Sequence, residues 1–216
     1  GQQDLEHINT LDISRFNDDL VSLLAGNETE VPVFDFKTGK RAPDGITLKV
    51  GNDQPLIIEG IHGLNPMLLS DGVDPEAIFK VYVSALTTLN LDDHNRIRTT
   101  DVRLLRRLVR DYETRGASME KTLSMWASVR RGEETWIFPY QEHADALFNT
   151  TLVYEVAVLK KYVYPLLNAV PPESPCFASA RDIVKFLNYF VDADVYDEIP
   201  PTSILREFIG GNTFYN

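Results

Sequence analysis

The stretch LIIEGIHGLNP, residues 56–66, ends an apolar run on a carboxylate, Glu59, and places two glycines around His62. In open α/β sheets ligands lie outside the carboxyl ends of the strands, where a carboxylate can orient the water shell of Mg²⁺. The glycines would let a ligand approach the backbone closely, because they have no Cβ. The stretch predicts that Glu59 binds Mg²⁺ through a water molecule. The alternative is that Glu59 is an acidic residue at a strand end that pairs with an arginine. His62 could reach a base edge or carry a proton, although a packed, hydrogen-bonded histidine is commoner.

Arginine is concentrated in residues 96–131, where nine Arg and one Lys stand against four acidic residues, whereas the whole chain has a net charge of −11. At the helical period, the apolar residues of 104–112 gather on one side. Four arginines fall on the opposite side: Arg103, Arg106, Arg107 and Arg110. Like charges on adjacent turns repel one another, and arginine suits bidentate recognition of phosphate. The pattern favours a phosphate-facing helix over an ordinary solvated face.

The segment VPVFDFKTGKR, residues 31–41, and the following ITLKV are typical of a hairpin around a glycine-bearing loop. Phe34 offers a ring for stacking, and Asp35 offers an acceptor for sugar hydroxyls. The alternative is an exposed hairpin with one inward-facing aromatic residue.

The elements that must position these residues alternate between strands and helices. Beside the hairpin, PLIIEG is predicted as a buried strand and FKVYVSA and ADALFN as two further strands. The periodicity predicts helices over residues 12–24, about 100–115, 119–131, 153–163 (broken near Pro165) and 178–190. This alternation predicts an α/β fold with a mainly parallel sheet and flanking helices.

Composition limits the class of protein. The chain has 216 residues, 44% of them hydrophobic, and this length suits one well-buried domain better than two small ones. No run of eighteen apolar residues exists, so no membrane span is expected. Cys176 is the single cysteine, which excludes an internal disulfide and favours a cytoplasmic location. The histidines lack metal-ligand spacing, and the basic residues are confined to one segment, so neither structural zinc nor nucleic-acid binding is expected.

Three segments together carry a family resemblance. VPVFDF, LIIEGIHGLNP and RRLVRDYETRG, in that order and at those separations, resemble the uridine kinase and phosphoribulokinase family of P-loop kinases. Within the family, the chain is most similar to a bacterial nucleoside-kinase-like branch through DFKTGKR, EGIHGLNP, SVRRGEE, FPYQEHAD and SILREFIGG. The resemblance covers nearly the whole chain.

The resemblance implies a P-loop α/β kinase that uses Mg²⁺ with ATP and moves the γ-phosphoryl group to a sugar hydroxyl, with uridine or cytidine as leading substrates. It implies that Glu59 is the acidic residue ending a Walker B-like strand, with a catalytic role. Asp35 is similar to the family residue that holds the ribose hydroxyls, with Phe34 beside the nucleoside. His62 is placed with these two as a substrate residue.

The same resemblance implies roles for the arginine helix. Arg107, Arg110 and Arg115 match arginines of a lid segment, here residues 100–131, that faces phosphate and substrate. Arg107 is expected to bind substrate, and Arg110 and Arg115 to act in catalysis. From the helical pattern, Arg103 and Arg106 are expected to bind phosphate. A lid of this kind excludes water from the γ-phosphate when it closes.

The chain departs from the family pattern at the phosphate loop. A GxxxxGK[ST] loop cradles phosphates with backbone amides and a lysine, but here Gly39 and Lys40 precede Arg41, and Phe34 stands where the leading glycine should be. The segment that supplies the catalytic base is also absent. We therefore expect residues 1–216 to be the C-terminal part of a single kinase domain, inactive alone, with a C-terminal helix and tail over residues 171–216.

Two smaller departures and two alternatives remain. Ala117 stands where uridine kinases often have a further arginine and Asn65 where they often have an aromatic residue, which leaves pyrimidine specificity open. A sugar-phosphate kinase of the phosphoribulokinase type would need another phosphate site, for which Arg96, Arg98, Arg130 and Arg131 are available. A non-catalytic module that binds a nucleotide or a partner is the second alternative.

Strands without neighbours would leave an exposed sheet edge, which favours self-association into a homo-oligomer.

Overall fold

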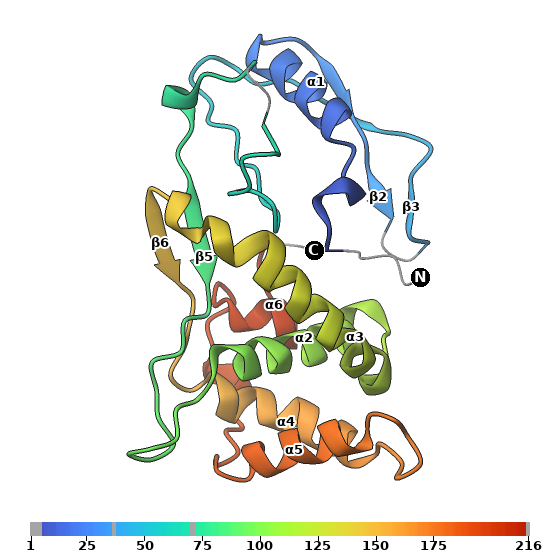
Figure 1. Cartoon of the computed structure of the whole chain (residues 1–216), viewed down its shortest axis with the longest axis vertical. Coiled ribbons are helices and arrows are strands. Elements are labelled where there is room, and N and C mark those ends of the chain that lie inside the picture. The colour runs from blue at the N-terminus through green and yellow to red at the C-terminus, as the bar shows by residue number, and fades with distance from the viewer. Residues whose placement is uncertain (1–5, 36–37, 70–71, 215–216) are drawn as a thin grey trace. The chain divides into compact units, whose positions relative to one another are not determined.

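The computed structural model describes residues 6–35, 38–69 and 72–214. The chain divides into two compact units, which are described separately. Unit 1 comprises residues 1–82 and 128–147, and unit 2 comprises residues 83–127 and 148–216. Figure 1 labels the main helices and strands of both units.

The helices predicted from periodicity are present. The α-helices are α1 Ile13–Leu24, α2 Thr99–Arg115, α3 Met119–Gly132, α4 Glu155–Asn168, α5 Phe177–Leu187 and α6 Leu205–Ile209. Short helical turns are η1 Ile8–Thr10, η2 Pro75–Ala77, η3 Glu133–Ile137, η4 Phe138–His143 and η5 Tyr196–Glu198. The strands are β1 Thr29–Val31, β2 Phe34–Asp35, β3 Lys40–Arg41, β4 Ile46–Leu48, β5 Val81–Ser84 and β6 Ala146–Asn149. In the part of the chain that the structure describes, no helix is long and apolar enough to cross a membrane.

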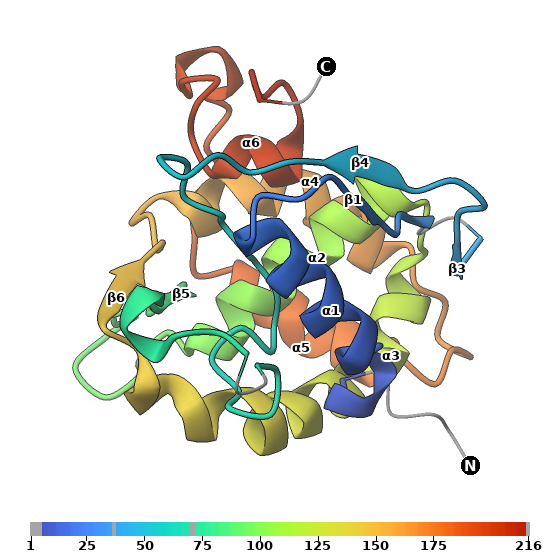
Figure 2. The ribbon, with the colours of Figure 1, turned by 90° about the horizontal axis from the view of Figure 1, so that it is seen from above.

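The predicted hairpin is confirmed in unit 1. β1 pairs antiparallel with β4, and β2 pairs antiparallel with β3. At the turn, Gly39 has a φ of 67° and donates its N–H to the Asp35 carbonyl, a conformation that glycine adopts without Cβ strain. The α1 helix begins at the N-cap residue Asp12 and buries Leu20 and Leu23. Figure 2 shows β1 and β4 side by side along α1.

β5 and β6 form a parallel pair. The N–H of Ala146 donates to the Lys80 carbonyl, and the N–H of Thr150 donates to the Ser84 carbonyl, so the two strands run in the same direction. The α/β character predicted from the sequence is confirmed. The described strands form one parallel and two antiparallel pairs, so the parallel sheet is smaller than expected.

The strand predicted for PLIIEG is wrong. Residues 55–59 form neither strand nor helix, and Ile57 and Ile58 are 87% and 44% exposed. Their backbone has no ladder partner among the described residues. A continuous apolar run forms a parallel strand only where neighbouring strands pair with it and both faces are covered. Glu59 therefore follows an exposed, irregular segment.

Unit 2 has a helical core. The helices α2, α4, α5 and α6 pack together (Figure 1). Their buried apolar side chains belong to one cluster. Leu108, Leu159 and Leu187 are completely buried in it, and burying a leucine side chain contributes about 1.5–3 kcal/mol. The apolar side predicted for the arginine helix is confirmed from Leu104 to Val109, whereas Tyr112 is 43% exposed.

The helix break predicted near Pro165 is wrong, because α4 continues to Asn168. Proline removes one backbone donor and disturbs the preceding turn. Here it lies in the last turn of the helix, where its carbonyl still accepts the N–H of Ala169. The complete burial of Leu167 keeps this last turn in place.

A buried ion pair joins α2 to α4. Arg106 Nε donates to Glu155 Oε2 at 2.6 Å, and the two side chains are 9% and 1% exposed. The Arg106 Nη atoms donate to the hydroxyl and the carbonyl of Thr150 at 3.0 and 2.7 Å. Glu155 Oε1 accepts the N–H of Leu152 at 3.0 Å. Both charged groups are thus well hydrogen-bonded, the condition under which a buried pair offsets its desolvation cost.

Replacing Glu155 with glutamine should destabilise unit 2 by about 3–5 kcal/mol, because Arg106 would keep a buried charge without its carboxylate. The free energy of unfolding from urea titration measures this loss. Asp182→Asn is the matched control, since it removes a carboxylate from an exposed pair with Lys185, both side chains being 76% exposed. Similar stability for the Glu155→Gln variant and the control would contradict the role of the buried pair.

Candidate functional site

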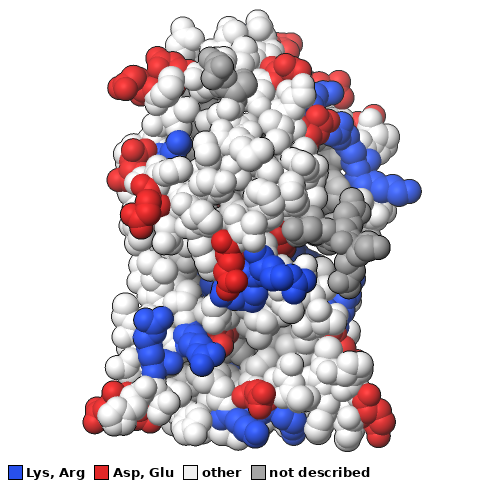
Figure 3. Space-filling model, in the orientation of Figure 1, with Lys and Arg blue, Asp and Glu red and all other residues white. Residues whose placement is uncertain are grey.

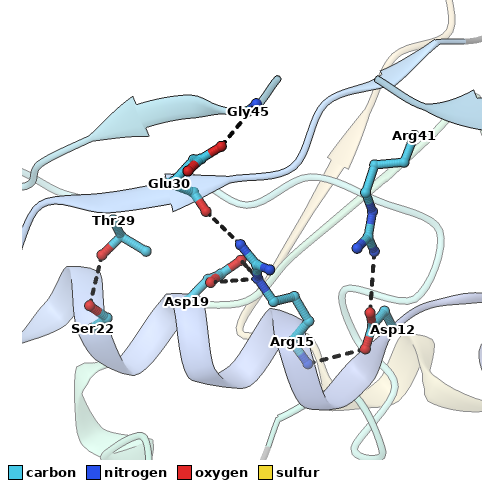
Figure 4. Close-up of polar contacts among 8 residues, drawn as sticks. All are labelled: Asp12, Arg15, Asp19, Ser22, Thr29, Glu30, Arg41 and Gly45. Atoms are coloured by element: carbon cyan, nitrogen blue, oxygen red, sulfur yellow. Dashed lines mark hydrogen bonds and ion pairs between the residues drawn. The ribbon is translucent and has the colours of Figure 1, made fainter. Parts of the chain in front are cut away.

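The α1 helix holds the β1–β4 pair through side-chain contacts shown in Figure 4. Arg15 Nη2 donates to the Glu30 carbonyl on β1 at 2.8 Å, and Arg15 Nε pairs with Asp19 at 3.0 Å. The Glu30 carboxylate accepts the N–H of Gly45 at 3.2 Å. A Cβ at Gly45 would lie 2.6 Å from the Val31 carbonyl oxygen, so this close approach requires glycine.

Arg41 on β3 connects the β2–β3 pair to α1 (Figure 4). Its guanidinium lies 3.2 Å from Asp12 Oδ2, and both side chains are about half exposed. The backbone N–H of Arg15, followed by the Arg41 side chain, lowers the pKa of Asp12. An exposed pair of this kind orients the hairpin more than it stabilises the fold.

The predicted substrate residues Phe34 and Asp35 lie on β2, and positions 36 and 37 of the same motif lie outside the described residues. Phe34 is 54% exposed, so its ring is accessible for stacking. Asp35 Oδ2 accepts the Thr38 hydroxyl at 2.8 Å, which fixes the carboxylate at the start of the turn. The hairpin thus presents an aromatic ring and a carboxylate at neighbouring positions.

Glu59 is exposed, and within the described ranges its carboxylate makes no hydrogen bond or ion pair. No group of three or more His, Cys, Asp or Glu residues suited to a metal occurs among the described residues. Mg²⁺ usually keeps several waters and is held by one or two carboxylates together with substrate phosphates. A single accessible carboxylate fits such a shared site, whereas it does not fit a cage made by protein ligands alone.

His62 lies in a series of turns over residues 60–68 that α1 anchors. Asn17 Nδ2 donates to the Leu68 carbonyl at 2.9 Å, and the N–H of Asn65 donates to the His62 carbonyl at 2.9 Å. The side chains of His62 and Asn65 belong to residues that are only 3% exposed. The burial of His62 fits the packed alternative, whereas the hydrogen bond which that alternative included is not found at either ring nitrogen among the described residues. Contact with a substrate base does not fit this buried position.

The stability of unit 1 should fall as the pH decreases below about 6.5, the ordinary pKa of histidine. Burial lowers the pKa of His62 from 6.5, His7 acts in the same direction, and the backbone of Glu6 opposes them. The unfolded chain then binds the proton more readily, so the stabilisation is present above the unfolded pKa and is lost on acidification. Denaturant titrations from about pH 7.5 to about pH 5.5 measure the slope.

The variant His62→Gln should lose part of this pH dependence. His143→Gln, in the same unit, is the control because His143 is exposed. Equal slopes for the wild-type chain and the His62→Gln variant would show that His62 does not contribute.

Three arginines of α2 converge on one buried carboxylate in unit 2. Arg110 donates Nε and Nη2 to Asp111 Oδ1 at 3.2 and 3.1 Å, and Arg115 donates Nη1 to the same oxygen at 3.3 Å. Arg107 Nε lies 3.3 Å from Asp111 Oδ2. The side chains of Arg107, Arg110 and Arg115 are 21%, 25% and 44% exposed, whereas the Asp111 side chain is 8% exposed. We call these four residues the arginine cluster.

The arginine cluster carries a net positive charge, because three guanidinium groups share one carboxylate. Burial lowers the pKa of Arg115, and the neighbouring Arg110 and Arg107 act in the same direction, while Asp111 and Glu207 oppose them. Such a pattern is expected where like charges are held close together. The cluster is therefore suited to bind an anion on its exposed side.

Arg106 does not belong to a phosphate-facing surface. Its donors bond inside unit 2, and its guanidinium carbon lies 5.3 Å from the centroid of the Phe208 ring. The predicted phosphate role does not fit this position, because Arg106 borders the buried Val102 and Val109 on the helical wheel. Arg103 is half-buried and interacts within the chain.

In the lower half of Figure 3, where α2, α4 and α5 lie, basic side chains lie beside acidic ones.

The N-terminal end of α2 lines a cavity of about 500 Å³ in unit 2. Its lining residues are His94, Asn95, Arg96, Arg98, Thr99 and Thr100. Asp92 shapes the preceding loop by accepting the N–H groups of His94 and Asn95, both at 2.8 Å. Two of the four surplus arginines thus share a cavity with the first turn of a helix. Arg130, in unit 1, is instead paired with Glu133 and Glu134.

The sequence predictions missed two functional candidates, Asp111 and Glu155. Asp111 could have been found, because it stands four residues after Arg107 and four residues before Arg115, the spacing of helical ion pairs. Glu155 lies 49 residues from Arg106, and no local signal connects them.

Comparison with known proteins agrees with the resemblance noted in the motifs. The family described as phosphoribulokinase / uridine kinase matches residues 3–157. Uridine kinases of Staphylococcus aureus strains JH9 and Newman are each 30% identical to this chain over 131 residues, which are 60% of this chain and 54% of each relative. The chain spans about half the length of the curated relatives it matches.

The family match extends over most of the chain. The chain belongs to the phosphoribulokinase / uridine kinase family.

Proposed function

We propose that the protein containing this chain transfers the γ-phosphoryl group of ATP to a sugar hydroxyl of a nucleoside, with uridine and cytidine as leading acceptors. The observation that carries the proposal is the arginine cluster, in which Arg107, Arg110 and Arg115 surround one buried carboxylate. Phosphoryl transfer develops negative charge on the transferred group and its oxygens. Positioned cations stabilise that charge without reorganising during the reaction.

The hairpin of unit 1 supports a nucleoside as acceptor. Phe34 offers an exposed ring on which a base can stack, and the Asp35 carboxylate can accept hydrogen bonds from two ribose hydroxyls. The similarity of this chain to uridine kinases supports the same class of acceptor. The role of His62 is then to pack the segment that follows Glu59.

Glu59 would orient the water shell of the magnesium ion that accompanies ATP. Bound Mg²⁺ neutralises charge on the phosphates and orients them for in-line displacement. The accessibility of the Glu59 carboxylate supports this role. A cytoplasmic location is expected for such an ATP-dependent enzyme, in agreement with the single cysteine.

A sugar-phosphate kinase of the phosphoribulokinase type is the second candidate. Its acceptor carries a phosphate of its own, which requires a second anion site. The cavity of about 500 Å³ beside Arg96 and Arg98 offers one, because these two arginines and the first turn of α2 line it. This observation favours the second candidate specifically.

The experiment that separates these functions is phosphate transfer from ATP to nucleosides and to ribulose 5-phosphate. The longest natural product of the gene is assayed together with this 216-residue chain. Turnover of uridine or cytidine supports the first candidate, and turnover of ribulose 5-phosphate supports the second. No turnover of any acceptor, with no acceptor-stimulated loss of ATP, would leave a non-catalytic binding module.

Arg110→Ala should lower kcat by about 10²–10³-fold, because a donor positioned at the developing charge is removed. Steady-state kinetics with the active form of the protein measure the change, and the KM for the nucleoside should change little. Arg131→Ala is the control, since Arg131 is exposed and lies outside the arginine cluster. Equal kcat values for the Arg110→Ala variant and the wild type would exclude a catalytic role for Arg110.

Asp35→Asn should raise the KM for the nucleoside by roughly 10–150-fold, since hydrogen bonds to a charged acceptor contribute about 1.5–3 kcal/mol. Asparagine keeps an acceptor for Thr38, so the turn is preserved. Asp44→Asn, at an exposed position of the same hairpin, is the control. An unchanged KM in the Asp35→Asn variant would remove Asp35 from the acceptor site.

A further inference from the structure

Asp111 occupies the centre of the arginine cluster, and no role for it follows from the family resemblance. Both of its carboxylate oxygens are used. Oδ1 accepts from Arg110 and Arg115, and Oδ2 lies near Arg107 and accepts the Thr122 hydroxyl of α3 at 3.4 Å. The residue is 6% exposed, so solvent and ligands do not reach the carboxylate directly.

The backbone of Asp111 is held as firmly as its side chain. Its carbonyl accepts the N–H of Gly116 and the N–H of Ala117, the latter at 2.9 Å. Gly116 adopts a φ of 61°, the left-handed conformation that ends many helices and that glycine adopts readily. The end of α2, the turn into α3 and the arginine cluster therefore depend on one residue.

Three neighbouring guanidinium groups would repel one another without a shared counterion, and their long side chains would sample many rotamers. The Asp111 carboxylate removes both effects, because it attracts all three groups to one point. The Asp111 side chain is 8% exposed, whereas those of Arg107, Arg110 and Arg115 are 21%, 25% and 44% exposed, so solvent reaches the arginines but hardly the carboxylate.

We infer that Asp111 is a positioning residue that orders Arg107, Arg110 and Arg115 for multidentate binding of substrate phosphates. The inference rests on the proposed function, in which these arginines bind phosphate. Such binding requires fixed guanidinium groups, and the inference is that Asp111 fixes them. Asp111 acts through the arginines and does not touch the substrate.

Charge alone predicts the opposite effect of removing Asp111. Loss of one negative charge raises the local positive potential, so an anion would bind more tightly if the arginines kept their places. If Asp111 orders them, its loss weakens binding despite the more favourable charge. The sign of the change in affinity therefore separates positioning from simple electrostatics.

The test is calorimetric titration of inorganic tripolyphosphate into the full 216-residue chain and its Asp111→Asn variant, with folding verified by circular dichroism. Glu113→Gln is the matched control, because it removes the same charge from an exposed position of the same helix. We expect Asp111→Asn to bind about 10-fold or more weakly, and Glu113→Gln to bind as tightly as the wild type or more tightly.

The outcomes distinguish the inference from the proposed function. Equal or tighter binding by Asp111→Asn, with clear binding by the wild type, would overturn the positioning role and leave the phosphate site intact. Absence of tripolyphosphate binding by the wild type would overturn the phosphate role of the arginine cluster itself, and the positioning role with it.

A second measurement does not depend on the folding of a variant. In ¹⁵N spectra of the wild-type chain without anions, the Nε–H group of Arg110, which donates to Asp111 Oδ1, should exchange slowly and resonate apart from that of the exposed Arg131. An averaged Arg110 signal like that of Arg131 would show that Asp111 does not order the Arg110 side chain, and would overturn the inference.

Discussion

A helix that carries arginines along the border of an apolar core is stable only if carboxylates accompany the buried charges. Removing a guanidinium group from water costs several kcal/mol unless a partner and further hydrogen bonds replace the lost solvation. In α2, Glu155 supplies this partner for Arg106, and Asp111 supplies it for the arginines toward the C-terminal end of the helix. The packing of unit 2 around α2 depends on these two acids.

The two acids divide the arginines by function. Arg106 donates its hydrogen bonds to Glu155 and Thr150, and thereby fixes α2 against α4 and the segment that follows β6. The arginines around Asp111 keep exposed sides, because three of them share a single carboxylate. One helix therefore contains both a structural charge and a surplus of positive charge, and it is this surplus that we propose binds an anionic substrate.

The elements predicted correctly from the sequence are those whose cause is local. The helical period, the N-cap Asp12 and the glycine-bearing turn act within a few residues, and α1, α2 and the hairpin follow them. The strand predicted for PLIIEG is absent because a strand requires a partner elsewhere in the chain, and residues 55–59 have none among the described residues. The burial of Arg106 was not predicted for the same reason, since its partner Glu155 is remote in sequence. Local periodicity identifies a charged face but not which of its charges meets an acid from another helix.

The C-terminal segment SILREFIGG completes the surroundings of α2. The family match ends at residue 157, yet α6 lies beyond that point and packs directly on α2. Phe208 is 5% exposed and its ring lies against the Arg106 guanidinium, so it excludes water from the buried pair with Glu155. Arg206 in turn holds α6 by donating to the carbonyls of Tyr196 and Ile199. Because the strength of a buried ion pair depends on the exclusion of water, the segment outside the matched region helps to fix the helix that carries the arginine cluster inside it.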